Sequence, residues 1–367
     1  MCDLEQRIDI IQIDLPKFEY ISRFWVQSRE VEVGVGLFLL SLLFDILNNM
    51  ANATRGEDYS TQHLSQRYYF HDSNMDLFLV GAIGWGPAGG LSIGEAFYVA
   101  SQIADGDADS WSRAFESQGI AQSMQADVWQ RRGAIQAAGE MRLKAFACYR
   151  MAWQFVAPGE RFTALYRAHE KLFDQAMIQL SFPVTRFAVS YGGGKLPDRF
   201  LSQGRYLFER GYSIALVDLP GQGIFQEQGL HWEPAVEKPI AAVIDELIAS
   251  FGVKPRKLAL LGMSIGVYFA CRAAAHEPRL AAVIATTPLP HPLELFEKVA
   301  KQDAEATVSQ AAQKNREVIL WKAGVSDLSE LAQRWEGMIA DPKKVHMPFL
   351  SVLGEQEGQV WKDQAQE

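Results

Sequence analysis

Residues 258 to 269 read LALLGMSIGVYF, and this stretch constrains the fold more than any other part of the chain. An apolar run breaks at Gly262, Ser264 and Gly266, which form a G-x-S-x-G motif, and then becomes apolar again. Between a buried strand and a helix, this motif is typical of a sharp turn that lifts the serine hydroxyl out of a parallel sheet. Both glycines are expected because side chains there would collide with neighbouring backbone. The alternative is a glycine-rich turn that holds an incidental serine.

The predicted turn places Ser264 at the N-terminus of the helix that follows it. The helix dipole and the backbone N–H of Ile265 would then face the negative charge that develops on a substrate oxygen. The sequence therefore predicts Ser264 as a catalytic nucleophile and Ile265 as an oxyanion donor.

The pattern of apolar residues along the chain changes near residue 181. Before this point apolar residues recur three and four apart, as in 134–156 and 161–180, which predicts helices. From residue 182 onward the β-rich runs RFAVSY, YSIALVDLP, KLALLGMS and LAAVIATTP alternate with helical segments. Such alternation is typical of a mainly parallel sheet with helices on both faces. We therefore expect an α/β fold, with a helical domain over 1–180 and an α/β domain over 181–367.

Composition and charge exclude several classes of function. The chain has 367 residues and is 48% hydrophobic, which is enough for a large buried core. A net charge of -9 disfavours nucleic acid as a partner, because no basic groove is expected. The first residues of the chain include acidic ones, whereas an export signal would begin with basic residues, so no export signal is expected. The apolar stretch 31–44 is shorter than the ~20 residues of a membrane span, so we expect a buried helix there and a cytoplasmic protein without membrane contact.

The cysteines give no sign of a cross-linked or metal-binding framework. Cys2, Cys148 and Cys271 are odd in number, lie far apart and form no C-x-x-C pair. We therefore expect a reducing compartment, no disulfides, no metal and no cofactor.

A second glycine-rich stretch, GWGPAG at 84–89, fits the G-x-G-x-x-G pattern of dinucleotide sites and is followed by Asp105. That fingerprint needs a second strand that ends at the acidic residue, whereas Asp105 lies in a polar loop. Pro87 also has no backbone N–H to donate to a phosphate. We interpret the stretch as a turn between helices.

Longer stretches carry a family resemblance. GYSIALVDLPGQG (211–223), EQGLHWEP (227–234), KLALLGMSIGVYFACRAAAHEPRLAAVIATTP (257–288) and the helical RMAWQFV (150–156) resemble α/β-hydrolases of the fermentation-respiration switch group. This group includes 2,6-dihydroxypseudooxynicotine hydrolase and polyketide-shortening hydrolases. The resemblance implies an α/β-hydrolase core, an N-terminal helical cap and a Ser-Asp/Glu-His triad. It also implies water-driven cleavage of a C–C bond next to a carbonyl, or of an ester, in an aromatic or polyketide-like substrate.

The resemblance places the triad acid after the β-rich run in MPFLSVLGEQEG (347–358). Glu357 is the candidate and Glu355 the neighbouring alternative. The carboxylate would hold a histidine in the correct tautomer and stabilise the imidazolium. Two solvated loop glutamates are the competing interpretation.

The triad histidine is harder to place. In this fold the order is Ser, then Asp or Glu, then His, and no histidine follows Glu357 in the printed chain. His276 and His346 lie at the wrong ends of their elements, while His231 and His291 would suit ordinary loops as well as a cleft. The remaining histidines are His63, His71 and His169. Without a base, we expect the 367-residue chain to hydrolyse activated esters slowly or not at all, unless natural residues further along supply a histidine.

A second departure concerns the oxyanion hole. YGGGKLP (191–197) resembles the family's first hairpin, after which family members have another strand and a glycine loop that donates the second oxyanion N–H. Here Asp198 leads almost directly into SQGRYLFERG (202–211), which resembles the helix after that loop. We expect one strand and its loop to be missing, with Gly193 as the alternative donor.

Two hypotheses follow. The chain is either a serine hydrolase or a hydrolase-fold protein that binds a ligand or partner without turnover. In the first case the helical cap would cover Ser264 and form an apolar pocket for a small aromatic or polyketide-like substrate. Glu140 would be a polar group in that pocket. A homodimer is compatible with both hypotheses.

Overall fold

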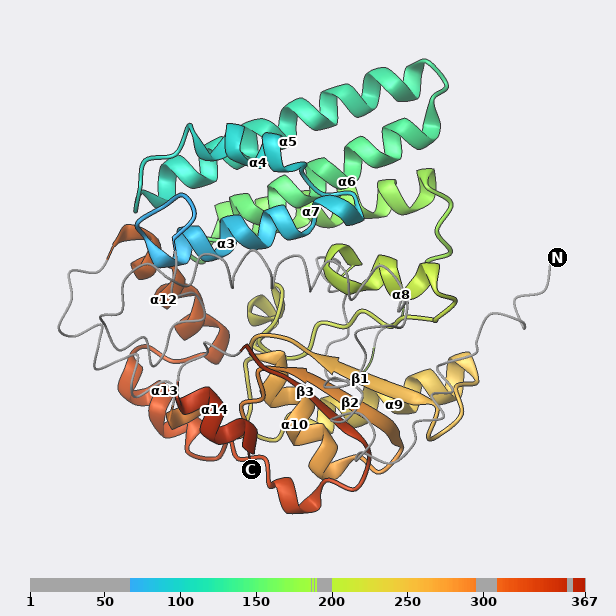
Figure 1. Cartoon of the computed structure of the whole chain (residues 1–367), viewed down its shortest axis with the longest axis vertical. Coiled ribbons are helices and arrows are strands. Elements are labelled where there is room, and N and C mark those ends of the chain that lie inside the picture. The colour runs from blue at the N-terminus through green and yellow to red at the C-terminus, as the bar shows by residue number, and fades with distance from the viewer. Residues whose placement is uncertain are drawn as a thin grey trace, which may run out of the picture.

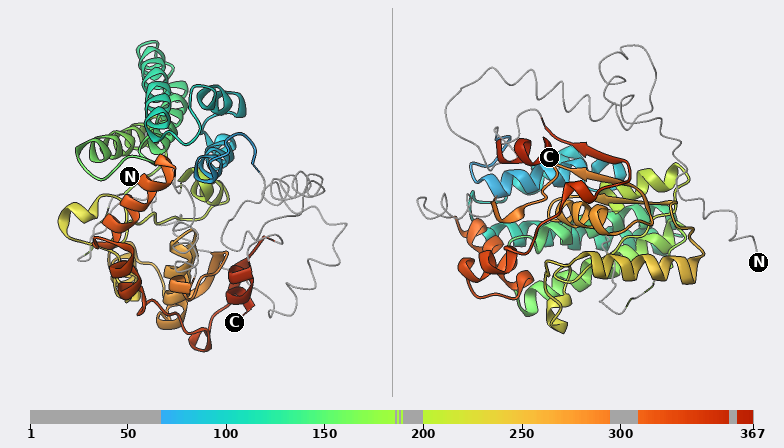
Figure 2. Two further views of the ribbon diagram at one scale, coloured as in Figure 1. Left: turned by 90° about the vertical axis from the view of Figure 1, so that its left-hand side faces the viewer. Right: turned by 90° about the horizontal axis from the view of Figure 1, so that it is seen from below.

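The computed structural model describes residues 67–185, 187, 189, 200–294, 309–354 and 359–366. In this part of the chain, a layer of long helices lies on one side of a three-stranded sheet and its shorter helices (Figure 1). The left view of Figure 2 shows the same separation. The apolar stretch 31–44 lies outside the described residues, and none of the described helices is long and apolar enough to cross a membrane.

The helical layer is built from five consecutive helices, which are α3 (Ser73–Gly84), α4 (Ile93–Ala100), α5 (Ala108–Arg131), α6 (Ile135–Ala152) and α7 (Glu160–Gln179). Local sequence sets where they begin. Asp72 and Asp107 accept hydrogen bonds from first-turn N–H groups of α3 and α5, and Ser92 forms a capping box with Glu95 at α4. The helices predicted over 134–156 and 161–180 are confirmed as α6 and α7.

The sheet contains β1 (Leu258–Gly262), β2 (Leu280–Thr286) and β3 (Phe349–Val352), all parallel and in the order β1-β2-β3. Leu261 pairs with Ile284, and Ala285 pairs with Ser351. Helix α10 (Gly266–His276) connects β1 to β2 as a crossover. The other helices of this half are α8 (Arg205–Glu209), α9 (Glu237–Phe251), α12 (Gln310–Ala323), α13 (Leu328–Trp335) and α14 (Gln359–Gln366).

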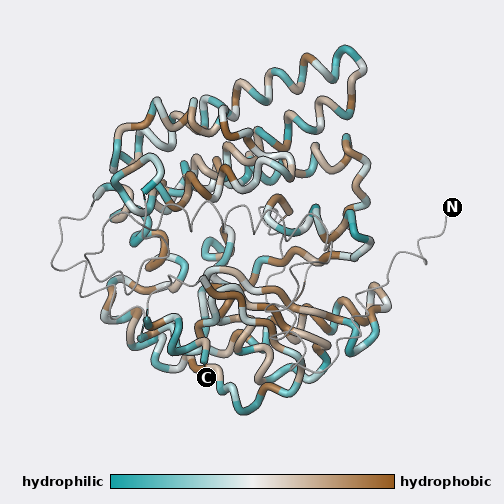
Figure 3. The backbone as a smooth tube through the Cα atoms, in the orientation of Figure 1, coloured by the Kyte–Doolittle hydropathy of each residue, from teal (hydrophilic) through white to brown (hydrophobic). Residues whose placement is uncertain are grey.

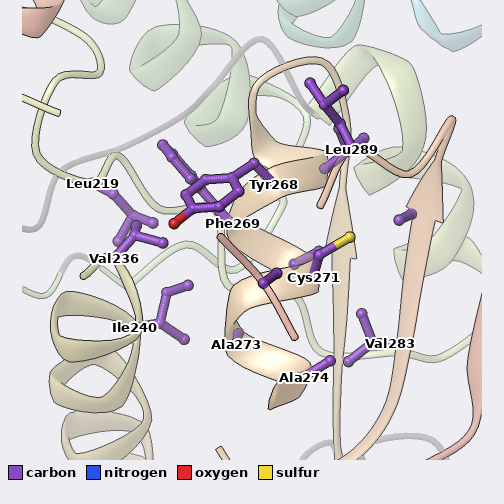
Figure 4. Close-up of a cluster of buried hydrophobic side chains, with 14 of the residues drawn as sticks. Leu219, Val236, Ile240, Tyr268, Phe269, Cys271, Ala273, Ala274, Val283 and Leu289 are labelled. Atoms are coloured by element: carbon purple, nitrogen blue, oxygen red, sulfur yellow. The ribbon is translucent and has the colours of Figure 1, made fainter. Parts of the chain in front are cut away.

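Each half has its own hydrophobic core. Around the sheet, side chains of α9, α10, β1 and β2 pack together, with Tyr268 and Phe269 of α10 near the centre (Figure 4). Hydrophobic residues are correspondingly dense along the strands in Figure 3. The core of the helical layer contains Trp111, whose Nε1 donates to the backbone oxygen of Met151 at 2.7 Å. Helix α12 also contributes Ala311 to this second core, so the C-terminal half helps to fix the helical layer.

The strand predicted over 212–220 is wrong for this structure. Residues 212–217 form no strand, and Asp218 makes only an isolated bridge. Strand β1 is an edge of the described sheet, because none of the described residues forms a ladder on its second side. A strand persists only where a neighbouring chain satisfies its N–H and C=O groups. The expected absence of one strand stays a prediction, and it would leave 212–217 without such a neighbour.

Polar contacts, one of them buried, join the helical layer to the other half. Tyr166 of α7 donates its hydroxyl to Asp218 Oδ2 at 2.8 Å, and Asp218 is almost completely buried. Nearby, Thr163 and Arg167 of the same helix contact the Glu227 carboxylate. Gly223 fits beneath the Tyr166 hydroxyl, where a Cβ atom would approach the phenol oxygen to 2.6 Å. These contacts hold α7 against the loop that follows residue 218.

Candidate active site

Ser264 has a strained backbone in a sharp turn from strand to helix. It lies between the last residue of β1 and the first residues of α10, and its φ is +55°. For a residue other than glycine, this left-handed conformation costs about 1–2 kcal/mol. The side chain is exposed, so the hydroxyl stands clear of the core. An exposed serine in a strained turn from strand to helix matches the geometry that the sequence predicts.

The two motif glycines have different roles. A Cβ atom on Gly262 would lie 2.2 Å from the Gly266 backbone oxygen and 2.7 Å from the Ala270 Cβ. A Cβ atom on Gly266 would meet nothing within 4 Å. The expectation that both glycines avoid collisions is therefore confirmed at Gly262 and wrong at Gly266, because only Gly262 lies where the strand and helix backbones approach each other.

The Ile265 backbone N–H is available to an oxyanion. In the first turn of α10, the Gly266 N–H donates to Met263 O and the Val267 N–H donates to Ser264 O, both at 2.9 Å. Within the described residues, the Ile265 N–H donates to no acceptor. A free N–H next to the serine, at the positive end of the helix dipole, is what the first half of an oxyanion hole requires.

The carboxyl ends of the parallel strands meet beside Ser264. The register that pairs Gly262 with Ala285 continues toward Thr287, which also has a positive φ of +61°. The Thr287 N–H donates to Val352 O, the last residue of β3. Figure 1 shows the helical layer on the side toward which these carboxyl ends point. Ligand sites of open α/β sheets lie at this edge.

Three of the described histidines use a ring nitrogen to bond to a backbone oxygen. The Nδ1 atoms of His169, His231 and His276 pair with the backbone oxygens of Tyr166, Trp321 and Arg272 respectively. His169 is buried between aromatic rings of the helical layer, and His71 and His346 are exposed. His291 lies at the start of the segment after β2, where its backbone N–H donates to Gln364 Oε1. Among the described residues, no side chain hydrogen-bonds to the Ser264 hydroxyl, so a general base is not identified.

The other candidate residues fall into two groups. Glu357, Glu355 and Gly193 lie outside the described residues. Glu140 is described, and its carboxylate lies 3.6 Å from Arg205 Nη1 in an ion pair between α6 and α8. This pairing accounts for the charge on Glu140, and its place in a substrate pocket stays a prediction. Cavities of about 240 and 380 Å³ lie in the helical layer and beside Glu227, and Ser264 lines neither of them.

The stretch over 84–89 is a turn, as predicted. Helix α3 ends at Gly84, a 3-10 turn spans Gly86–Ala88, and Gly89 has a φ of +107°. Asp105 accepts hydrogen bonds from the backbone N–H groups of His71 and Asp72, both at 2.9 Å. Its carboxylate therefore closes a loop of the helical layer and is not placed to bind a ribose.

The two described cysteines are poor candidates for a nucleophile. Cys148 and Cys271 are both buried. Burial raises the pKa of the Cys271 thiol to about 11 and also raises the pKa of the Cys148 thiol. Neither forms a reactive thiolate near neutral pH. In the described part of the chain, no cluster of three or more His, Cys, Asp or Glu side chains could hold a metal ion.

The Tyr166–Asp218 hydrogen bond was not predicted from the sequence. These residues are 52 positions apart and are brought together only by the docking of α7. In the sequence, Asp218 directly follows an apolar stretch. An acidic residue in such a place is a weak sign that its carboxylate is paired with another side chain.

Comparison with known proteins identifies fungal hydrolases as relatives in sequence. No family model matches the chain. The curated 20-hydroxy-prefusarin hydrolase FUS2 of Gibberella moniliformis is 28% identical over 261 residues, covering 59% of this chain and 60% of the relative. Hydrolase LUC6 of Fusarium sp is 29% identical, with 59% and 60% covered, and hydrolase acrC of Aspergillus aculeatus is 28% identical, with 54% and 58% covered. The matches span about 60% of the length of these relatives.

Solved structures agree on the fold. The crystal structure of 2,6-dihydroxy-pseudo-oxynicotine hydrolase superposes with a TM-score of 0.60 at 20% identity, covering 77% of this chain and 84% of that one. The structure titled AbyA5 Wildtype superposes with a TM-score of 0.54 at 12% identity, covering 80% and 90%. The chain is therefore an α/β-hydrolase-fold protein, related in sequence to a group of fungal hydrolases.

Proposed function

We propose that this protein is a serine hydrolase that cleaves a C–C bond next to a carbonyl, or an ester, in an aromatic or polyketide-like small molecule. The observation that carries the proposal is the positive φ of the exposed Ser264 in the turn from β1 to α10, because strained backbone of this kind clusters at active sites. The names of the relatives, all hydrolases, support the reaction type.

The proposed chemistry begins with attack of Ser264 Oγ on the substrate carbonyl carbon. The Ser264 proton passes to a general base, and the negative charge on the carbonyl oxygen is held by the Ile265 N–H. The bond to the adjacent carbon then breaks, and its electron pair leaves as an enolate that takes up a proton. Water hydrolyses the ester formed on Ser264 and regenerates the hydroxyl. An ester substrate would follow the same steps with an alkoxide as the leaving group.

A second candidate function is ligand binding without turnover. It is favoured by one observation, namely that no described histidine hydrogen-bonds to the Ser264 hydroxyl. A serine without a base is a weak nucleophile. The helical layer at the carboxyl ends of the strands would serve a binding protein equally well.

Product analysis separates the two functions. We expect incubation with a simple aryl β-diketone, benzoylacetone, to yield a carboxylic acid and a methyl ketone in equal amounts, because water adds across the broken C–C bond. Phenyl acetate, as the ester control, would yield phenol and acetate. Both product pairs can be measured by liquid chromatography against buffer blanks. If neither compound is consumed faster than in buffer while the aryl β-diketone still binds, the protein is a binding protein and the hydrolase proposal fails.

A further inference from the structure

A cavity lies within the helical layer, between α5, α6 and α7. This cavity of about 240 Å³ is lined mainly by polar side chains, namely Ser123 and Asp127 of α5, Arg142 and Tyr149 of α6, and Lys171 and Gln175 of α7. A water molecule occupies about 30 Å³ in the liquid, so the cavity has room for more than one water. Ser264 and its neighbours are not part of it.

Arg142 is the unusual residue of this cavity. It is only 6% exposed, yet its Nε and Nη1 atoms have no hydrogen-bond acceptor in the described part of the chain. Only Nη2 is satisfied, by Asp127 Oδ1 at 3.0 Å and Gln130 Oε1 at 2.7 Å. A buried guanidinium normally satisfies its donors, because leaving them unpaired forfeits the hydration that they had in water. Two donor nitrogens beside a cavity therefore indicate that an acceptor belongs there.

The charges around the cavity favour an anion as that acceptor. Lys171 also lines the cavity and forms no ion pair with any described carboxylate, whereas Asp127 is largely exposed, with 56% of its side chain accessible. Two cations thus face one solvent-screened carboxylate, in a chain whose net charge is -9. Arginine and lysine in one concave site are the usual partners of a carboxylate or a phosphate.

We propose that this cavity binds the anionic group of a small molecule, a carboxylate or a phosphate, with Arg142 as the buried anchor and Lys171 as the second cation. The Nε and Nη1 atoms are buried in this structure, so an anion that reaches them has to displace side chains that line the cavity. The site is separate from the proposed catalytic serine, and it stands whether or not Ser264 turns over a substrate.

Titration calorimetry of the full chain tests this proposal with two probes, sodium benzoate and inorganic phosphate, each against sodium chloride at matched ionic strength. We expect at least one probe to bind, and the probe that binds tells whether a carboxylate or a phosphate is preferred. Lys171→Gln should weaken binding about fivefold, the loss of one partly exposed charge contact. Arg142→Gln should abolish it.

The matched control is Lys254→Gln, which removes an exposed lysine from the other half of the chain and should leave binding unchanged. If Arg142→Gln does not fold, Lys171→Gln alone decides, because Lys171 is exposed and its replacement leaves the helix intact. Binding of neither probe overturns the proposal. Binding that is equal in the wild type, Lys171→Gln and Lys254→Gln also overturns it.

Discussion

Gly262→Ala should lower the free energy of unfolding by about 3 kcal/mol, the upper end of the usual cost of overpacking. The added Cβ would lie 2.2 Å from the Gly266 oxygen, and this neighbour is backbone that cannot rotate away. Strand β1 and helix α10 would have to separate, and with them the turn that carries Ser264. Urea unfolding followed by circular dichroism measures the loss.

Gly266→Ala is the matched control for this prediction. It lies four residues later in the same motif, but its Cβ would enter open space at the first position of α10. We expect it to be neutral or to stabilise by up to about 1 kcal/mol, because alanine is the better helix former. Equal destabilisation by the two alanines would show that the close approach of β1 and α10 at Gly262 is not what the motif requires.

Ser264→Gly should separate stability from function. Glycine adopts a φ of +55° without steric cost, so this variant should be about 1 kcal/mol more stable than Ser264→Ala, which retains the strain. Both variants should lose all enzyme-dependent turnover, however slow the wild type is, because no ester can form on the enzyme without Oγ. Thermal unfolding and hydrolysis of an activated aryl ester, measured side by side, check both effects.

Two results would contradict the prediction for the Ser264 variants. If Ser264→Ala and Ser264→Gly are equally stable, the serine is not strained in solution. If either variant hydrolyses the ester as fast as the wild type, the nucleophile is another group and the turn is incidental.

The strand, turn and helix around Ser264 could be predicted from the sequence because the causes are local. The apolar run before Gly262, the serine and the helix-forming residues after Gly266 lie within twelve residues, and the structure places β1 and α10 there. The long helices α6 and α7 were predictable for the same reason, since a repeating apolar pattern needs no distant partner.

Features that depend on distant partners were not predictable. The run at 212–220 has strand composition, yet a strand also requires a neighbour to satisfy its backbone, and composition does not reveal whether that neighbour exists. Arg142 resembles any solvated helix arginine in the sequence, because only the packing of α5 and α7 around it makes it buried. The partner of Asp218 likewise lies on a helix 52 residues away.

The central claim is that the turn after β1 presents Ser264 as a nucleophile. Its most direct test is to treat the full chain with a fluorophosphonate and to locate the adduct by peptide mass spectrometry. The account predicts one adduct, on the oxygen of Ser264, and no adduct at that peptide in Ser264→Ala. Equal labelling of the wild type and Ser264→Ala, or an adduct confined to another residue, would contradict it.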